Sequence, residues 1–164
     1  ANRKKRELEQ AKIQENPDGI DAVIAEGRGW IQKIREANDA LPGQEISDKL
    51  SQLETVTGKI FTCVEKHPEK LPEIRRFMNY YLPTTVKLVG SYREFENQPV
   101  QGENIQTAKK EILDILDTVN RAFASLLDSL FQNDAIDISA DISVLKTMLA
   151  QEGLTQKDFD KQPQ

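Results

Sequence analysis

Apolar residues recur along the chain in alternating steps of three and four, and this pattern appears in five separate segments. The segments run over Ile20–Leu41, Ile46–Val64, Ile74–Phe95, Ile105–Leu126 and Ile138–Leu149. Such steps average 3.5 residues, the period of long helices that pack at shallow angles. Alternating runs of β-branched residues, which would indicate strands, are nearly missing. The pattern therefore predicts an all-α fold, a bundle of about five helices.

Prolines and glycines separate these segments, for example at Leu41-Pro42-Gly43 and at His67-Pro68. Short connections of this kind are typical of helices that turn back on their neighbours. We expect a single bundle domain at 18–153, a basic N-terminal segment at 1–17 and a flexible tail at 154–164. The last helix is expected to begin with Ser139 as its N-cap.

The fourth predicted helix is apolar on two faces. Its main stripe runs from Ile105 to Leu126, and a second stripe passes through Leu116, Phe123, Leu127 and Leu130. A helix with two apolar faces needs cover on both. We therefore expect this helix in the middle of the bundle.

Pro83 interrupts the third predicted helix, within the stretch MNYYLPTTVKLV. A proline inside a helix lacks its N–H group and crowds the carbonyl four residues back, at a cost of about 3 kcal/mol. The apolar spacing continues across it, so we expect one bent helix, with Thr84 and Thr85 bonding to carbonyls one turn back. The structural interpretation makes Tyr81, Tyr92 and Phe95 core residues. The functional alternative is a pocket lined by the freed carbonyl and both threonines, beside Tyr80 and Arg76.

Composition and charge exclude several classes of function. The 164 residues carry a net charge of −5, yet residues 1–12 alone carry +3, so the rest carries −8. An acidic chain of this kind is not expected to bind nucleic acid. The single cysteine, Cys63, excludes an internal disulfide and a cysteine-rich metal site. No apolar run is long enough to span a bilayer. The basic cluster RKKR is a solvated helix start or, alternatively, a juxtamembrane segment.

Two stretches resemble a bacterial protein family. They are LPEIRRFMNYYLPTTVKLVGSYREFE, from Leu71 to Glu96, and ILDILDTVNRAFASLLDSLFQNDAIDISADISVLKTMLAQEGL, from Ile112 to Leu154. Both are similar to the 5-bromo-4-chloroindolyl phosphate hydrolysis family. The resemblance implies a cytoplasmic helical domain, often preceded by membrane-spanning helices that this sequence lacks, and an association with toxic-anion (tellurite) resistance proteins. It brings no set of catalytic positions.

The sequence lacks the catalytic motifs of the known phosphatase classes. Cys63 is not followed by arginine at the spacing of a cysteine phosphatase loop, and His67 is the only histidine. The one Asp-x-Asp pattern, Asp158-Phe159-Asp160, lies in the polar tail, and no phosphate-binding glycine loop occurs. Carboxylates remain: Asp137 and Asp141 share a helix face at a spacing of four, as Asp114 and Asp117 do at three. Such pairs either hold a divalent ion with help from another helix or form a solvated acidic face.

Arg75, Arg76 and Lys87 are the candidates for anion binding. Their alternative role is to pair with neighbouring glutamates, each pair contributing a few tenths of a kcal/mol. We interpret the chain as a non-catalytic interaction or scaffold module with no cofactor, located in the cytoplasm or at the inner face of the cell membrane. We expect self-association or a protein partner, a toxic-anion resistance protein among the candidates. The alternative is a weak metal-assisted phosphoester hydrolase that uses Asp137 and Asp141.

Overall fold

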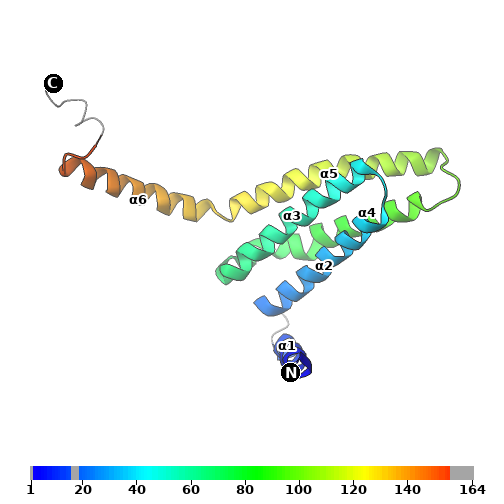
Figure 1. Cartoon of the computed structure of the whole chain (residues 1–164), viewed down its shortest axis with the longest axis horizontal. Helices are drawn as coiled ribbons and strands as arrows, with labels where there is room; N and C mark the ends of the chain where they lie inside the picture. The colour runs from blue at the N-terminus through cyan, green and yellow to red at the C-terminus, as the bar shows by residue number, and fades with distance from the viewer. Residues whose placement is uncertain (1, 16–18, 156–164) are drawn as a thin grey trace. The chain divides into compact units, whose positions relative to one another are not determined.

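The computed structural model describes residues 2–15 and 19–155, with side chains at 2–8 and 19–155. Every regular element in these ranges is helical, which confirms the all-α fold class (Figure 1). The elements are α1 (Asn2–Glu15), α2 (Ile20–Ala40), α3 (Gln44–Lys66), the 3₁₀ helix η1 (Pro68–Ile74), the π-helix η2 (Phe77–Tyr81), α4 (Leu82–Glu96), α5 (Glu103–Ser129) and α6 (Gln132–Gln151). The five predicted helices are present, and residues 2–15 form a further one.

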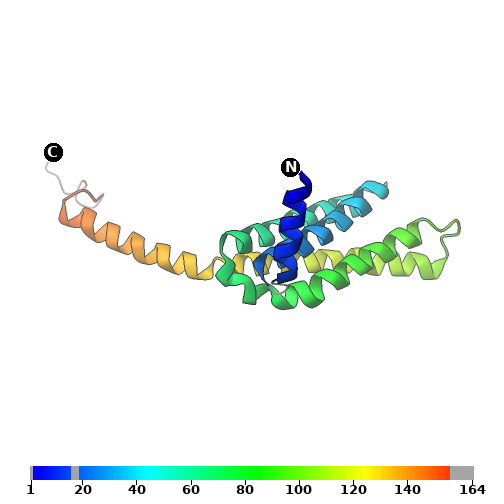
Figure 2. The same ribbon diagram turned by 90° about the horizontal axis from the view of Figure 1, so that it is seen from below.

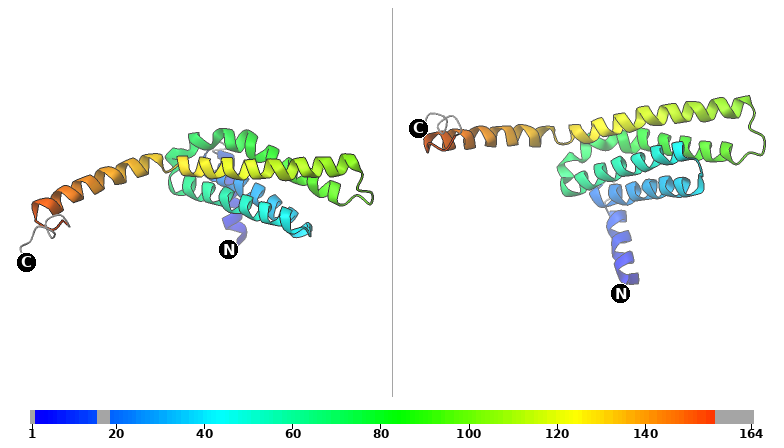
Figure 3. Two further views of the ribbon diagram at one scale, coloured as in Figure 1. Left: turned by 90° about the horizontal axis from the view of Figure 1, so that it is seen from above. Right: turned by 45° about the horizontal axis from the view of Figure 1, so that its top comes forward.

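Helices α2, α3, α4 and α5 lie side by side, and successive helices run in opposite directions (Figures 1 and 3). The buried residues of each recur at steps of three and four, as in Leu50, Leu53, Thr57 and Ile60 of α3. Burial of these stripes is the main stabilising contribution, at roughly 1.5–3 kcal/mol for each large apolar side chain. The sequence pattern therefore identified the helices that form the core.

Helix α2 packs along both α3 and α4. Gly27 permits close packing against α3, because a Cβ atom there would lie 2.5 Å from the Phe61 ring of α3. The Phe61 ring in turn lies 5.8 Å from the Phe77 ring of η2, and the Phe77 ring meets the Phe123 ring of α5 edge-on at 4.8 Å. A line of three aromatic rings thus joins α3, η2 and α5 through the core.

The chain divides into two compact units, residues 1–127 and 128–164. The boundary falls inside the range 18–153, for which we expected one bundle domain; that domain assignment stays a prediction. Helix α6 starts at Gln132 with Phe131 as its N-cap, so the predicted start at Ser139 was wrong. Asp134 lies in the first turn, where negative charge favours a helix N-terminus. Most of the expected tail, from residue 156 on, lies outside the described residues.

No helix in the described ranges is both long and apolar enough to cross a membrane. Of the basic cluster RKKR, Arg3 forms an exposed ion pair with Glu7 one turn later in α1, at 3.4 Å. An exposed pair of this kind contributes little to stability.

Candidate functional site

The chain passes Pro83 through a widened helical turn. Residues Phe77–Tyr81 form the π-helix η2, and the N–H of Leu82 donates to the carbonyl of Phe77, five residues back. A wider turn suits this position because proline cannot donate to the carbonyl of Asn79. Thr85 Oγ1 donates to the Tyr81 carbonyl at 2.6 Å, the kind of bond expected from the sequence.

The widened turn changes which side chains face the core. Phe77 and Met78 are buried, whereas Tyr80 is 66% and Tyr81 53% exposed. After the turn, Leu82 takes the core position that the sequence spacing assigned to Tyr81. The expectation that Tyr81 belongs to the core was therefore wrong. The expectation assumed an uninterrupted α-helical period, which does not include the extra residue of a π turn.

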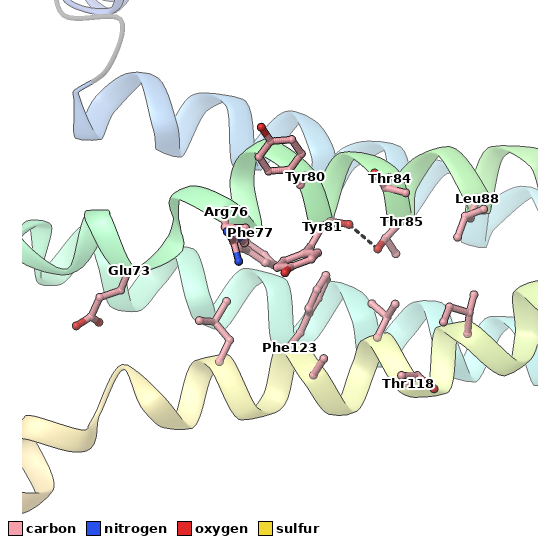
Figure 4. Close-up of a pocket in the computed structure, with 14 residues that line it drawn as sticks. Glu73, Arg76, Phe77, Tyr80, Tyr81, Thr84, Thr85, Leu88, Thr118 and Phe123 are labelled. Atoms are coloured by element: carbon pink, nitrogen blue, oxygen red, sulfur yellow. Dashed lines mark hydrogen bonds between the residues drawn. The ribbon is translucent and has the colours of Figure 1, made fainter.

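Side chains of η2 and α4 line a groove against α5 (Figure 4). This hollow has a volume of about 710 Å³ and is mostly apolar. Phe77 and Phe123 lie at its base, and Glu73, Arg76 and Thr118 supply polar groups. The remaining lining residues are Tyr80, Tyr81, Thr84, Thr85 and Leu88 on one side and Ile115, Val119, Ala122 and Leu126 on the other.

A second hollow continues along the same two helices, which lie next to each other in Figure 2. It has a volume of about 430 Å³ and shares Leu88 and Ile115 with the first. Together the two hollows follow α5 from Ala108 to Leu126, which is roughly 27 Å of helix at about 1.5 Å per residue. We call this combined feature the α4–α5 groove.

The groove runs along the main apolar stripe of α5, through Ile115, Val119 and Leu126. The face that carries the second stripe is buried, through Leu116, Asn120 and Phe123. The groove face lacks such cover, and Ile115 on it is 41% exposed. The expectation that α5 is covered on both faces, in the middle of the bundle, was therefore wrong.

Polar contacts hold α5 to α3 on the covered side. Lys49 Nζ lies 2.5 Å from Asp117 Oδ1, and Asn120 Nδ2 donates to the carbonyl of Lys49 at 3.1 Å. Asn120 is buried, so its amide bond to the backbone offsets part of the cost of removing it from water. These contacts secure one side of α5 and leave the groove side open.

Another ion pair joins α4 and α5 beyond the groove. Lys109 Nζ lies 2.5 Å from Glu96 Oε2 and 5.5 Å from the centre of the Tyr92 ring. Burial raises the pKa of the Tyr92 phenol; nearby Lys109 lowers it, and Glu96 and Glu45 raise it. The neutral phenol is therefore the form that the folded protein favours.

The candidate anion-binding residues lie in different places. Arg76 lines the α4–α5 groove, and Arg75 is exposed near it in sequence. Lys87 lines a separate hollow of about 410 Å³ between α2 and α4, with Trp30, Lys33, Glu36, Ala37, Pro83, Val86, Val89, Gly90 and Arg93. Arg76 and Lys87 therefore line different hollows, and the structure does not bring the three cations together in one pocket. Their role in anion binding stays a prediction.

The candidate carboxylates are likewise dispersed. Asp137 and Asp141 are exposed on α6, while Asp117 pairs with Lys49. The described residues contain no group of three or more His, Cys, Asp or Glu side chains placed to hold a metal ion. Cys63 is buried, and His67 Nδ1 lies 3.5 Å from Glu69 Oε1 at the surface. The pattern Asp158-Phe159-Asp160 lies outside the described residues.

The functional alternative at Pro83, a pocket lined by Thr84 and Thr85 beside Tyr80 and Arg76, names four residues of this groove, but the contribution of α5 was missed. The signal for that contribution was the double apolar stripe of α5, together with the periodic residues Tyr81 before the proline and Leu88 after it. The two stripes of α5 were interpreted as core contacts on both sides. A surplus of apolar residues over the available covering helices indicates an exposed binding surface instead.

Comparison with known proteins adds one finding. A family model described as 5-bromo-4-chloroindolyl phosphate hydrolysis protein matches residues 1–145. No curated protein and no solved structure matches the chain significantly. The match covers all of the α4–α5 groove and most of α6.

Proposed function

The chain belongs to the 5-bromo-4-chloroindolyl phosphate hydrolysis protein family, and from that premise we propose that it acts as a non-catalytic helical interaction module. The α4–α5 groove is its binding site, and an amphipathic helix of a partner protein is the ligand. The observation that carries this proposal is the main apolar stripe of α5, which lines a long open groove and has no covering helix among residues 2–15 and 19–127.

The dimensions of the groove favour a helix over a small ligand. Its length of roughly 27 Å corresponds to about five helical turns. A drug-sized molecule would occupy one hollow and leave the other exposed to water. Amphipathic helices bind such grooves through apolar residues at steps of three and four.

The groove has the composition of an interaction surface. Tyr80 and Tyr81 are large, exposed aromatic residues at its edge, and tyrosine is among the residues that contribute most to binding energy at protein interfaces. Glu73 and Arg76 lie at the η1–η2 end of the groove, where they offer charged contacts to the end of a bound helix. A toxic-anion resistance protein is the first partner to test, and the expected cytoplasmic location at the inner face of the membrane forms part of this proposal.

Site-specific photocrosslinking tests the binding site. A photoreactive p-benzoylphenylalanine at position 81, in the groove, is compared with the same residue at position 100 in native cells. Val100 is 73% exposed and lies outside the groove, so it provides a matched control. We expect a discrete adduct from position 81 only, and identification of the crosslinked segment should return an amphipathic helix.

The identified helix is then titrated as a purified peptide against the full chain. Ile115→Arg places a charge in the groove and should weaken binding at least tenfold, equivalent to about 1.4 kcal/mol. Val100→Arg adds the same charge outside the groove and should bind like the wild type. Equal binding by both variants would refute the groove as the site, and so would a crosslinked segment that is not helical.

A second candidate function comes from the aromatic and cationic groups at one end of the groove. Phe77, Tyr80 and Arg76 lie together there, a set that suits an aromatic phosphate ester. Hydrolysis of bromochloroindolyl phosphate by the purified chain, with and without Mg²⁺, Mn²⁺ or Zn²⁺, tests this alternative. Turnover that falls in Arg76→Ala would favour this hydrolase site over the interaction module, whereas metal-dependent turnover that falls in Asp137→Asn or Asp141→Asn would favour the carboxylate site expected on α6.

A further inference from the structure

Helix α6 exposes its apolar residues to solvent along its whole length. None of its 20 residues is buried, and Ile136, Ile138, Ile142, Val144, Leu145 and Met148 are each between 47% and 60% exposed. In proteins, most of the stability of a helix comes from packing of its apolar face rather than from intrinsic propensity. Several β-branched residues lower the intrinsic helix propensity of α6. An exposed apolar surface of this size indicates an interaction site.

Five of these positions form one continuous seam. Ala135, Ile138, Ile142, Leu145 and Leu149 follow each other at steps of three, four, three and four. They correspond to the a and d positions of heptads, with Ala135, Ile142 and Leu149 at a and Ile138 and Leu145 at d. Ile142 at a followed by Leu145 at d is the combination favoured by parallel two-stranded coiled coils. We call these five residues the α6 seam.

The charges beside the seam favour a parallel partner with the same sequence. Asp141 occupies a g position, and Lys146, the sole basic residue of α6, occupies the next e position. In a parallel pair in register, a g residue of one helix meets the e residue five positions later in the other helix. Asp141 of each copy would then face Lys146 of the other copy, which gives two such ion pairs, one on each side of the seam. An antiparallel pair would instead bring each of these charges near its own counterpart.

We infer that α6 pairs in parallel with α6 of a second copy of this chain, through the α6 seam, so that two chains form a dimer. This surface is distinct from the α4–α5 groove and does not depend on the proposed function. Ile136 and Val144 lie at b and c positions outside the seam, which makes them internal controls.

Sedimentation velocity of the purified full chain over a concentration series tests the dimer. We expect the wild type to shift from monomer to dimer, and Ile142→Asp or Leu145→Asp to weaken the dimer at least tenfold. Ile136→Asp and Val144→Asp add the same charge on the same helix and should leave the dimer unchanged. Ile115→Arg should also leave it unchanged, which separates this surface from the groove.

Charge exchange tests the parallel orientation. Asp141→Lys alone and Lys146→Asp alone each place like charges opposite one another and should weaken the dimer by about tenfold. The double variant restores opposite charges in a parallel pair and should return the wild-type affinity. A wild type that stays monomeric at its solubility limit would overturn the inference, as would a dimer that tolerates both seam variants. Equal affinity of the wild type and the single charge variants would overturn the parallel arrangement.

Discussion

Helices α5 and α6 both carry apolar residues at heptad spacing, but they differ in what covers those residues. In α5, Ile112, Leu116 and Phe123 are buried against the neighbouring helices. In α6, the equivalent residues, Ile138, Ile142 and Leu145, are about half exposed. Apolar residues at this spacing predict a buried face in either helix. The comparison shows that spacing determines which residues share a face, whereas the surroundings determine whether that face is covered.

The two faces of α5 repeat this contrast within a single helix. One face is packed against the core and secured by Asn120 and Asp117. The other lines the α4–α5 groove, with Ile115 partly exposed. Each of the two units therefore presents an apolar surface that its own helices leave uncovered, and the two surfaces differ in form. The groove is concave and suits a helix of a different protein, whereas α6 is convex and suits a second helix like itself.

The largest expected effect is the difference in lost stability between a buried leucine of α5 and an exposed leucine of α6. Leu116→Ala removes a side chain with no exposed area and should lower the free energy of unfolding by about 2–5 kcal/mol. Leu145→Ala makes the same change where the side chain is 55% exposed, and should lower that free energy by less than about 1 kcal/mol. Urea denaturation at low protein concentration, where α6 is unpaired, measures both values. Equal losses in the two variants would mean that α6 is part of the same cooperative core.

The second prediction sharpens the comparison by testing how closely the covered helices pack. Gly27→Ala would bring a methyl group within 2.5 Å of the Phe61 ring. We expect a net loss of about 1–2 kcal/mol, because overpacking exceeds the gain in helix propensity. Gly29→Ala is the matched control two residues later in α2, where nothing lies within 4 Å, and it should stabilise the protein by up to about 1 kcal/mol. Thermal unfolding of the two variants measures the difference, and a stabilising Gly27→Ala would show that α2 and α3 can separate at little cost.

Much of the fold could be predicted from the sequence because helical period and punctuation are local properties. Each periodic segment falls on helical structure, although Ile74–Phe95 runs from the end of η1 through η2 and α4. Leu41-Pro42-Gly43 separates α2 from α3 as expected. In α2, Gly27 permits the close approach of the Phe61 ring, whereas a Cβ atom at Gly29 would meet nothing within 4 Å. Which of two nearby glycines meets a ring depends on the neighbouring helix, and that information is not local.

The α5 side of the groove could not be predicted for a similar reason. The sequence indicated a helix bend at Pro83, but a proline is accommodated either by a kink or by a wider turn. The π turn of η2 moves Tyr81 from the core to the groove edge. The double stripe of α5 required cover on both sides, and no local pattern shows whether a second cover is present. The carboxylates Asp137 and Asp141 and the cations Arg75, Arg76 and Lys87 remain candidate residues whose roles need direct tests.

The smallest expected effect concerns the pH dependence of the covered part of the chain. The pKa of Tyr92 is raised in the folded protein, chiefly by burial, above its ordinary value of 10.0. The folded state therefore keeps this proton at a pH where the unfolded state has released it. The stabilising contribution is complete below about pH 10 and is lost as the pH rises through the folded pKa. Urea denaturation from pH 8 to pH 11 should give a shallower alkaline loss of stability for Tyr92→Phe than for the wild type.

Lys109→Met provides the opposite change, because Lys109 lowers the pKa of Tyr92 and its removal should raise that pKa further. Identical alkaline slopes in all three proteins would contradict the role of Tyr92. In α6 no tyrosine occurs, so Ile142→Asp, which opens the seam, should leave the alkaline slope of unfolding as in the wild type.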